Sequence, residues 1–175
     1  MNTLTKMALG LMGQLKARPA RGTAAQSLAL PPPGRAGGMP LMQALWQRQS
    51  QREFGTQPLV EPVLGELLWA AAGVNRPSLG GRTAPSAMNS QEVDVFVALP
   101  SGLYRYDPEA HALRLEVHSD VRGITGYQDF TDEAALDLVF VADHRRMALV
   151  PAAQREAYAF AAAGAMAQNV YLYCA

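Results

Sequence analysis

Arg48, Ser50 and Arg52 occupy alternate positions in residues 48–54, which read RQSQREF. Each guanidinium carries a permanent positive charge and a planar set of donors, and the hydroxyl between them adds a short donor. These groups suit a ligand with a phosphate and a second electron-rich group close by, whereas a neutral ligand would not require them. The string therefore predicts an anion-binding site at the end of a helix or in a turn.

A second polar segment has the composition of a turn. Residues 83–91 read TAPSAMNSQ, and Pro85 to Asn89 combine residue types that favour turns and helix starts. The free backbone N–H groups of such a segment can contact an electron-rich ligand. A simpler interpretation is that Ser86 only caps a helix. The two interpretations are compatible, because both use exposed N–H groups.

The basic string also has a simpler interpretation. Arg48 and Arg52 lie four positions apart, so on a helix they would share one face and could be solvated surface charges. Ser50 could be a residue that merely ends a helix. The residues of the string alone leave these alternatives open.

The composition argues against several classes of function. The 15 basic and 15 acidic residues balance, so the summed charge gives no long-range attraction for nucleic acid or an anionic membrane. Cys174 is the single cysteine, and no paired Cys/His spacing indicates a metal site. His111, His118 and His144 lack partners at a recognisable spacing, which argues against a catalytic triad. No segment has the roughly 20 apolar residues of a membrane span.

We expect residues 1–38 to be a poorly ordered lead and the folded domain to cover residues 39–175. Residues 30–40 are too rich in Pro and Gly for a helix or a central strand. The apolar run 7–13 resembles a degenerate secretory signal, but polar and basic residues between 14 and 21 interrupt it. We therefore expect a cytoplasmic protein, with a periplasmic location as the alternative.

Three segments have helical patterns. Apolar residues at helical spacing predict a short helix over 40–48, with Pro40 at its first position, and a second helix over 61–72 that ends at Gly73. Residues 152–174 form an Ala-rich stretch, which predicts a long buried helix. The first helix would present the basic string at its C-terminal end.

The middle of the chain has the period of β-strands. Residues 93–98, 103–106 and 113–117 are separated by Pro/Gly and Asp-Pro turns, which predicts an antiparallel meander. The run 136–142 is nearly continuously apolar, as expected of a strand buried on both faces. The 175 residues, of which 49% are hydrophobic, are enough for one domain of α+β class.

Five segments, in this order, resemble the nitroreductase family, specifically the subgroup that contains the SagB-type dehydrogenases. They are residues 48–54, 67–73, 82–91, 102–107 and 168–172, and the resemblance covers roughly residues 39–175. It implies an α+β fold with an antiparallel-rich central sheet flanked by helices. It also implies a homodimer in which two intertwined subunits hold one FMN in each of two interface pockets.

The resemblance also implies roles for individual residues. Arg48, Gln49 and Ser50 would hold the phosphate and ribityl end of FMN, and Arg52 would lie beside the pyrimidine side of the flavin ring, where a cation stabilises the reduced form. The Pro85–Asn89 turn would reach in from the partner subunit. Gln168 and Asn169 are expected to be buried polar groups satisfied by the backbone. The full set of expected cofactor-binding residues is Arg48, Gln49, Ser50, Arg52, Pro85, Ser86, Ala87, Met88 and Asn89.

The function implied is an FMN-dependent oxidoreductase that transfers hydride from NAD(P)H, through the flavin, to a small organic acceptor. No catalytic side chain, metal, nucleic acid or membrane is expected to take part. Two alternatives remain: SagB-like oxidation of a heterocycle in a modified peptide, and a remnant of the fold that binds no flavin. The remnant is considered because relatives continue past the last helix into a Gly-rich loop and another strand. This sequence stops at Ala175, so the domain is expected to be incomplete at its C-terminal end.

Overall fold

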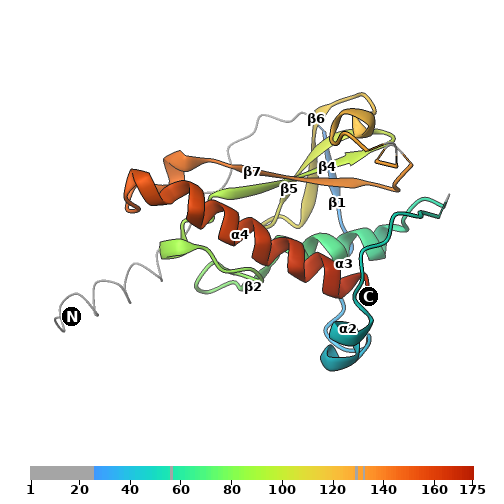
Figure 1. Cartoon of the computed structure of the whole chain (residues 1–175), viewed down its shortest axis with the longest axis horizontal. Helices are drawn as coiled ribbons and strands as arrows, with labels where there is room; N and C mark the ends of the chain where they lie inside the picture. Colours follow the sequence, from blue (N-terminus) through green and yellow to red (C-terminus); the bar gives the residue numbers. More distant parts are fainter. Residues whose placement is uncertain (1–25, 56, 129, 132) are drawn as a thin grey trace.

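The computed structural model describes residues 26–55, 57–128, 130–131 and 133–175 (Figure 1). The helices are α2 (Leu41–Gln47), α3 (Glu61–Ala72) and α4 (Ala152–Tyr173), with short 3₁₀ turns η1 (Ala87–Asn89), η2 (Arg122–Ile124) and η3 (His144–Met147). The strands are β1 (Ser27–Ala29), β2 (Val74–Arg76), β3 (Gly81–Arg82), β4 (Val93–Leu99), β5 (Gly102–Asp107), β6 (Ala112–Val117) and β7 (Asp137–Ala142). The signal-like run lies outside the described residues.

Five strands form the central sheet in the order β1-β6-β5-β4-β7, and every neighbouring pair is antiparallel. Strands β4, β5 and β6 are the predicted meander, joined by the two predicted turns. A separate hairpin of β2 and β3 follows α3. The predicted α+β class is confirmed.

Helices α3 and α4 cover one face of this sheet and enclose the core (Figure 1). Leu68 and Ala71 of α3 have no exposed surface, and they meet Val97 and Leu113 of the sheet, which are also fully buried. Met166 of α4 completes the cluster. Burying one such aliphatic side chain contributes about 1.5–3 kcal/mol, so this layer fixes the position of both helices.

The predicted helices agree with the structure to within about a residue at their ends. Helix α3 has the predicted bounds, and the N–H of Gly73 closes it by donating to the Trp69 carbonyl at 2.7 Å. Pro40 lies one position earlier than expected, at the N-cap rather than inside the first turn, because its ψ angle of 139° is extended. Pro151 is the N-cap of α4, directly before the predicted start of that helix.

Strand β7 is present where predicted, but its expected burial on both faces is wrong for the described chain. It lies at the edge of the sheet, paired only with β4, and its residues are half-buried or exposed. Val141 keeps 44% of its surface exposed. The apolar composition predicts a buried strand, but only a neighbouring chain segment could supply that burial.

Helix α4 is also less buried than its composition predicts. Ala159, Ala162 and Met166 face the core, whereas the opposite side is exposed along its length. Phe160 and Tyr171 keep 71% and 50% of their surface exposed. The helix therefore presents an apolar face that the described residues of one chain do not cover.

The sheet begins earlier than the expected start of the domain. Residues 27–29, within the predicted lead, form β1 and pair with β6, with Leu28 opposite Leu113. A three-residue strand has too few positions to show an alternating pattern, so sequence analysis could not detect it. Residues 30–40 are irregular, as expected.

Glu66 of α3 joins the lead to the end of α4. One of its carboxylate oxygens accepts the Gly34 N–H at 3.0 Å, and the other accepts the hydroxyl of Tyr173 at 2.9 Å. Burial and this bond to a carboxylate raise the pKa of Tyr173 to about 12. The bond favours the protonated phenol, which can donate.

We expect Glu66→Gln to lower the pKa of Tyr173 while leaving it above that of free tyrosine, because burial remains. The folded pKa is raised above the unfolded value of about 10, so the stabilisation is present below pH ~10 and is lost as the pH rises through the folded pKa. Ultraviolet absorbance during a pH titration would measure the pKa of Tyr173. The transition that Tyr173→Phe removes belongs to Tyr173, and Glu61→Gln, at an exposed acid of the same helix, is the control. An unchanged midpoint in Glu66→Gln would show that the bond does not contribute.

Candidate functional site

A groove of about 1200 Å³ lies between the segment after α2, strand β7 and the C-terminal half of α4. Its walls are largely apolar and include Leu138 and Phe140 of β7 and Val170 of α4. Among the described residues that line it, Arg48 is the one arginine or lysine. A groove of this kind suits a ligand with a flat apolar ring system and an anionic group.

The structure brings two of the four predicted residues of the basic string to this groove. Arg48 ends α2, donates its N–H to the Ala44 carbonyl at 2.9 Å and lines the groove together with Gln49. Ser50 and Arg52 are exposed and are not among its lining residues. The cofactor-binding roles of all four residues stay predictions, and the structure places Arg48 and Gln49 beside the groove.

The predicted turn has an unusual backbone. Met88, Asn89 and Gln91 have φ angles of 53°, 52° and 48°, the left-handed region that residues other than glycine rarely adopt. Each such residue costs of order 1–3 kcal/mol and persists only where its surroundings enforce it. Strain of this kind is concentrated at functional sites, which agrees with the ligand-contact interpretation of residues 85–89.

Hydrogen bonds of Gln91 and Ser86 hold the turn in this shape. The Gln91 side chain accepts from Arg82 Nε at 2.9 Å and donates to the Gly80 carbonyl at 2.7 Å and to Asn89 Oδ1 at 3.0 Å. The Ser86 hydroxyl accepts the N–H of Gln91 at 2.9 Å. Ser86 makes no side-chain capping bond to η1, so the interpretation of Ser86 as only a helix cap is wrong.

Arg82 connects the turn to the end of α3. Its guanidinium donates to the Ala72 carbonyl at 3.0 Å as well as to Gln91. Burial lowers the pKa of Arg82, and nearby acidic groups, Glu109 first among them, oppose this effect. A small cavity of about 30 Å³ lies beside Arg82, enough for a water molecule.

We expect Gln91→Ala to lower the free energy of unfolding by about 1–2 kcal/mol, because it leaves Arg82 Nε and the Gly80 carbonyl without these partners. Urea denaturation would measure this. Gln154→Ala, at an exposed glutamine of α4, should stay within about 0.5 kcal/mol of the parent. Equal midpoints for the two variants would contradict the structural role of Gln91.

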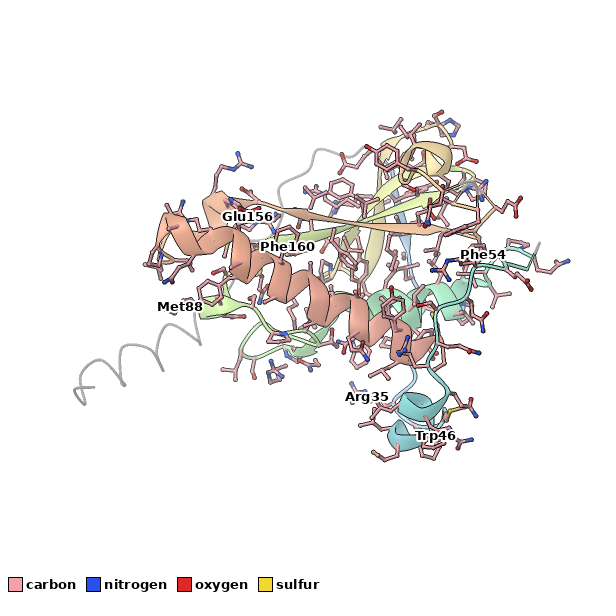
Figure 2. All side chains as sticks on the ribbon, in the orientation of Figure 1. Arg35, Trp46, Phe54, Met88, Glu156 and Phe160 are labelled. Carbon is pink, nitrogen blue, oxygen red and sulfur yellow. The ribbon has the colours of Figure 1, made fainter. Side chains whose placement is uncertain are left out.

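The groove and the turn lie at opposite ends of α4 within one chain. Ala87 and Met88 pack against the buried cluster of Met147, Val150 and Ala159, and Ala159 lies in the N-terminal half of α4. Val170 and Tyr171, which line the groove, lie near the C-terminal end of α4. Figure 2 shows Met88 and Trp46 at these two ends. Ala159 and Val170 are 11 positions apart on α4, or roughly 17 Å along the helix axis. None of residues 85–91 lines the groove, so the turn and the groove are separate within one chain.

The last helix carries the polar pair for which backbone partners were expected. Asn169 Nδ2 donates to the Ala70 carbonyl at 3.0 Å, which confirms the expectation for Asn169. Gln168 is exposed, so the same expectation is wrong for Gln168. Neither residue lines the groove.

Comparison with known proteins identifies the family of the chain. Residues 45–175 match the model of the nitroreductase family. A Methanocaldococcus jannaschii protein whose name places it among the nitroreductases is 31% identical over 142 residues, which are 75% of this chain and 71% of that protein. The chain belongs to the nitroreductase family.

Solved structures show the nitroreductase fold directly. The chain is similar to a crystal structure from Ralstonia eutropha JMP134 that is also named as a nitroreductase, with 59% identity, a TM-score of 0.81, and coverage of 91% of this chain and 76% of that one. It also resembles a chain of the E. coli microcin synthetase McbBCD complex with truncated pro-MccB17 bound, with 16% identity and a TM-score of 0.57 over 98% of this chain and 77% of that one. The second likeness concerns the fold alone.

Membership in the nitroreductase family implies flavin-dependent oxidoreductase chemistry, and the predicted family is confirmed. The hydrogen bonds of Arg82 and Gln91 that hold the 85–89 turn were not predicted from the sequence. Both residues flank the turn, but their bonds depend on the folded backbone. In the part of the chain that the structure describes, no helix is both long and apolar enough to cross a bilayer.

Proposed function

We propose that this nitroreductase-family protein is an FMN-dependent oxidoreductase that takes hydride from NAD(P)H and delivers it to a small organic acceptor. The observation that carries the proposal is the groove in which one guanidinium, Arg48, lies at the end of largely apolar walls. That donor set fits an FMN molecule, with a phosphate for Arg48 and an aromatic ring for the apolar walls. When bound, FMN supplies the two-electron chemistry.

The residues of this chain would bind and orient the cofactor. Arg48 and Gln49 would hold the phosphate and ribityl groups, and Ser50 and Arg52 would reach the cofactor if the exposed part of the string closes over the groove. In that position the Arg52 guanidinium would stabilise negative charge on the pyrimidine side of the ring. The apolar walls from β7 and α4 would exclude water from the other side.

We infer that the functional unit is a homodimer paired along the exposed face of α4. Ala157, Ala161, Gly164 and Gln168 follow one another along this face, and all four are exposed. A Cβ built on Gly164 meets nothing within 4 Å, so another helix has room to approach there. Exposed apolar side chains on both sides of this stripe, among them Phe160, would become buried.

Two-fold pairing explains why the two halves of the site are far apart in one chain. In an antiparallel pair of α4 helices, the N-terminal half of each helix lies beside the C-terminal half of its partner. The 85–89 turn of one chain would then face the groove of the other. The strained turn and the Arg48 groove would form one complete site only in the dimer.

The experiment uses two samples of the purified protein. One is heated to release and identify any bound flavin. The other is loaded with FMN and mixed with NADH or NADPH in the absence of oxygen. Loss of flavin absorbance on adding a reduced nicotinamide, and its recovery on adding a quinone or nitroaromatic compound, would support the proposal. A protein that stays colourless after incubation with FMN would support the alternative of a remnant that binds no flavin.

The SagB-like alternative is favoured by the extent of the groove, whose lining runs from Leu136, directly before β7, to Phe140 of that strand. A peptide carrying a thiazoline or oxazoline ring would be its substrate. If small quinones reoxidise the flavin and such peptides are not oxidised, the small-acceptor hypothesis is supported. If the peptides are oxidised and the quinones do not react, the peptide hypothesis is supported.

A further inference from the structure

Glu92 is a fully buried acid without a hydrogen-bond partner. Its exposed surface is 0%, and among the described residues neither carboxylate oxygen has a partner. It directly follows Gln91 and precedes β4. Residues 86–91, which contain the three left-handed residues, are called the 86–91 turn below. Buried polar atoms are rarely left unpaired, and an ionised carboxylate without solvent or a partner is costly. The absence of a partner therefore needs a physical explanation.

The positive charges of Arg146 and His144 act on Glu92, but Arg146 is bonded to other groups. The Arg146 guanidinium of η3 donates to the Gln91 carbonyl at 2.9 Å and to the two carboxylate oxygens of Asp94 at 2.9 and 2.5 Å. Arg146 Nε also lies 3.7 Å from a carboxylate oxygen of Asp143, and His144 belongs to the same turn.

The backbone holds this group of residues against the turn. The Glu92 carbonyl accepts the Asp143 N–H at 2.8 Å, which fixes the start of η3 beside β4. Helix α4 packs against η3, and near its start Arg155 donates to the Val150 carbonyl. Arg146 thus connects the turn, through the Gln91 carbonyl, to β4 and η3.

Burial favours the neutral form of Glu92. It raises the pKa of Glu92, against the opposing effects of the residue's own backbone N–H and of the positive charges of Arg146 and His144. A protonated Glu92 has little attraction for Arg146, which can stay on the Gln91 carbonyl and Asp94. An ionised Glu92 would compete with both for the same guanidinium.

We propose that Glu92 is a proton-dependent switch for the 86–91 turn. With Glu92 neutral, Arg146 holds the Gln91 carbonyl and the turn keeps its strained backbone. With Glu92 ionised, Arg146 is drawn away, the Gln91 carbonyl loses its donor, and the turn relaxes. The small cavity lined by Gln91, Asp94 and Arg146 can hold a water molecule, which could bond to the Gln91 carbonyl when Arg146 leaves it.

The direction of the effect follows from linkage. Because Glu92 holds its proton more tightly in the folded chain than in the unfolded chain, its contribution to stability is present at low pH and declines as the pH rises through the folded pKa. This pH dependence of stability concerns the fold of one chain. A second expected effect, weaker flavin binding at high pH, rests on the proposed function.

The experiment uses the cofactor-free full chain, so its outcome does not depend on flavin binding. Hydrogen exchange of residues 86–91, corrected for intrinsic rates, and the thermal midpoint are measured from about pH 5 to about pH 9. The parent should lose roughly tenfold or more of its protection in the turn as the pH rises. Glu92→Gln, which mimics the neutral acid, should keep constant protection, and Glu156→Gln on the exposed surface of α4 should behave as the parent.

Equal pH dependence in Glu92→Gln and the parent would overturn the proposal, as would a parent whose turn does not respond to pH. Infrared spectroscopy of the parent gives a second test that holds even if Glu92→Gln does not fold. A carboxylic acid C=O band at the low end of this pH range that disappears as the turn opens would support the switch. A folded parent without such a band would overturn it.

Discussion

Replacing Arg48 with alanine should weaken FMN binding by roughly 10- to 100-fold, since a hydrogen bond to a charged group contributes about 1.5–3 kcal/mol. Arg48 is the one arginine or lysine among the described residues that line the groove, so no neighbour there can replace its charge. Quenching of tryptophan fluorescence would measure binding, because Trp46 also lines the groove.

The matched control is Arg35→Ala, which removes an equal charge from an exposed position in the lead (Figure 2). This variant should bind FMN as the parent does. The affinity lost on Arg48→Ala should also be smaller for riboflavin, which lacks the phosphate. An equal loss for riboflavin and FMN would show that Arg48 does not contact the phosphate.

Gly164→Lys should convert the proposed dimer into a folded monomer that has lost FMN. Position 164 is open in the single chain, and replacing glycine inside a helix improves helix propensity by up to about 1 kcal/mol, so α4 should still form. In a two-fold dimer two lysines would meet between the packed helices. Burying unpaired charges there should raise the dimer dissociation constant by roughly 100-fold or more.

Sedimentation velocity with circular dichroism would separate assembly from folding. Ala110→Lys adds the same charge at an exposed turn between β5 and β6 and should leave the dimer intact. A Gly164→Lys protein that remains dimeric and binds FMN normally would place the interface elsewhere. If Gly164→Lys does not fold, its helical circular dichroism signal is lost. Ala161→Glu, at a neighbouring exposed position of α4, then makes the same test of the interface.

Local patterns were sufficient to predict most of the regular elements. Helix α3 has the predicted bounds because its apolar face and Gly73 at its end both indicate the same segment. The meander was equally clear, since its strands are separated by strong turn residues. By contrast, β1 and the β2–β3 hairpin are too short to show a period, and only their long-range pairing defines them.

Burial was harder to predict than secondary structure, because it depends on what lies next to each element in space. Strand β7 and helix α4 both have the composition of fully buried elements, yet each is partly exposed in the described chain. Two independent elements therefore differ from expectation in the same direction. A partner chain that covers both would remove the difference, which supports the proposed dimer.

The site was predictable only in part. The residues at Arg48 and in the 85–89 turn could be proposed from sequence, because charge, hydroxyl and turn composition are local properties. The bonds that enforce the left-handed residues come from Arg82 and Gln91. The buried Glu92 and its neighbour Arg146 are separated by the whole of the β4–β7 region, so only the fold brings them together.

The most direct test is sedimentation of the purified protein in the presence of FMN, monitored at both protein and flavin absorbance. If each site is built from the Arg48 groove of one chain and the 85–89 turn of another, flavin should sediment with a particle of twice the chain mass at one FMN per chain. Flavin bound to a monomer would contradict a shared site, and a dimer that sediments without flavin would contradict the proposed cofactor.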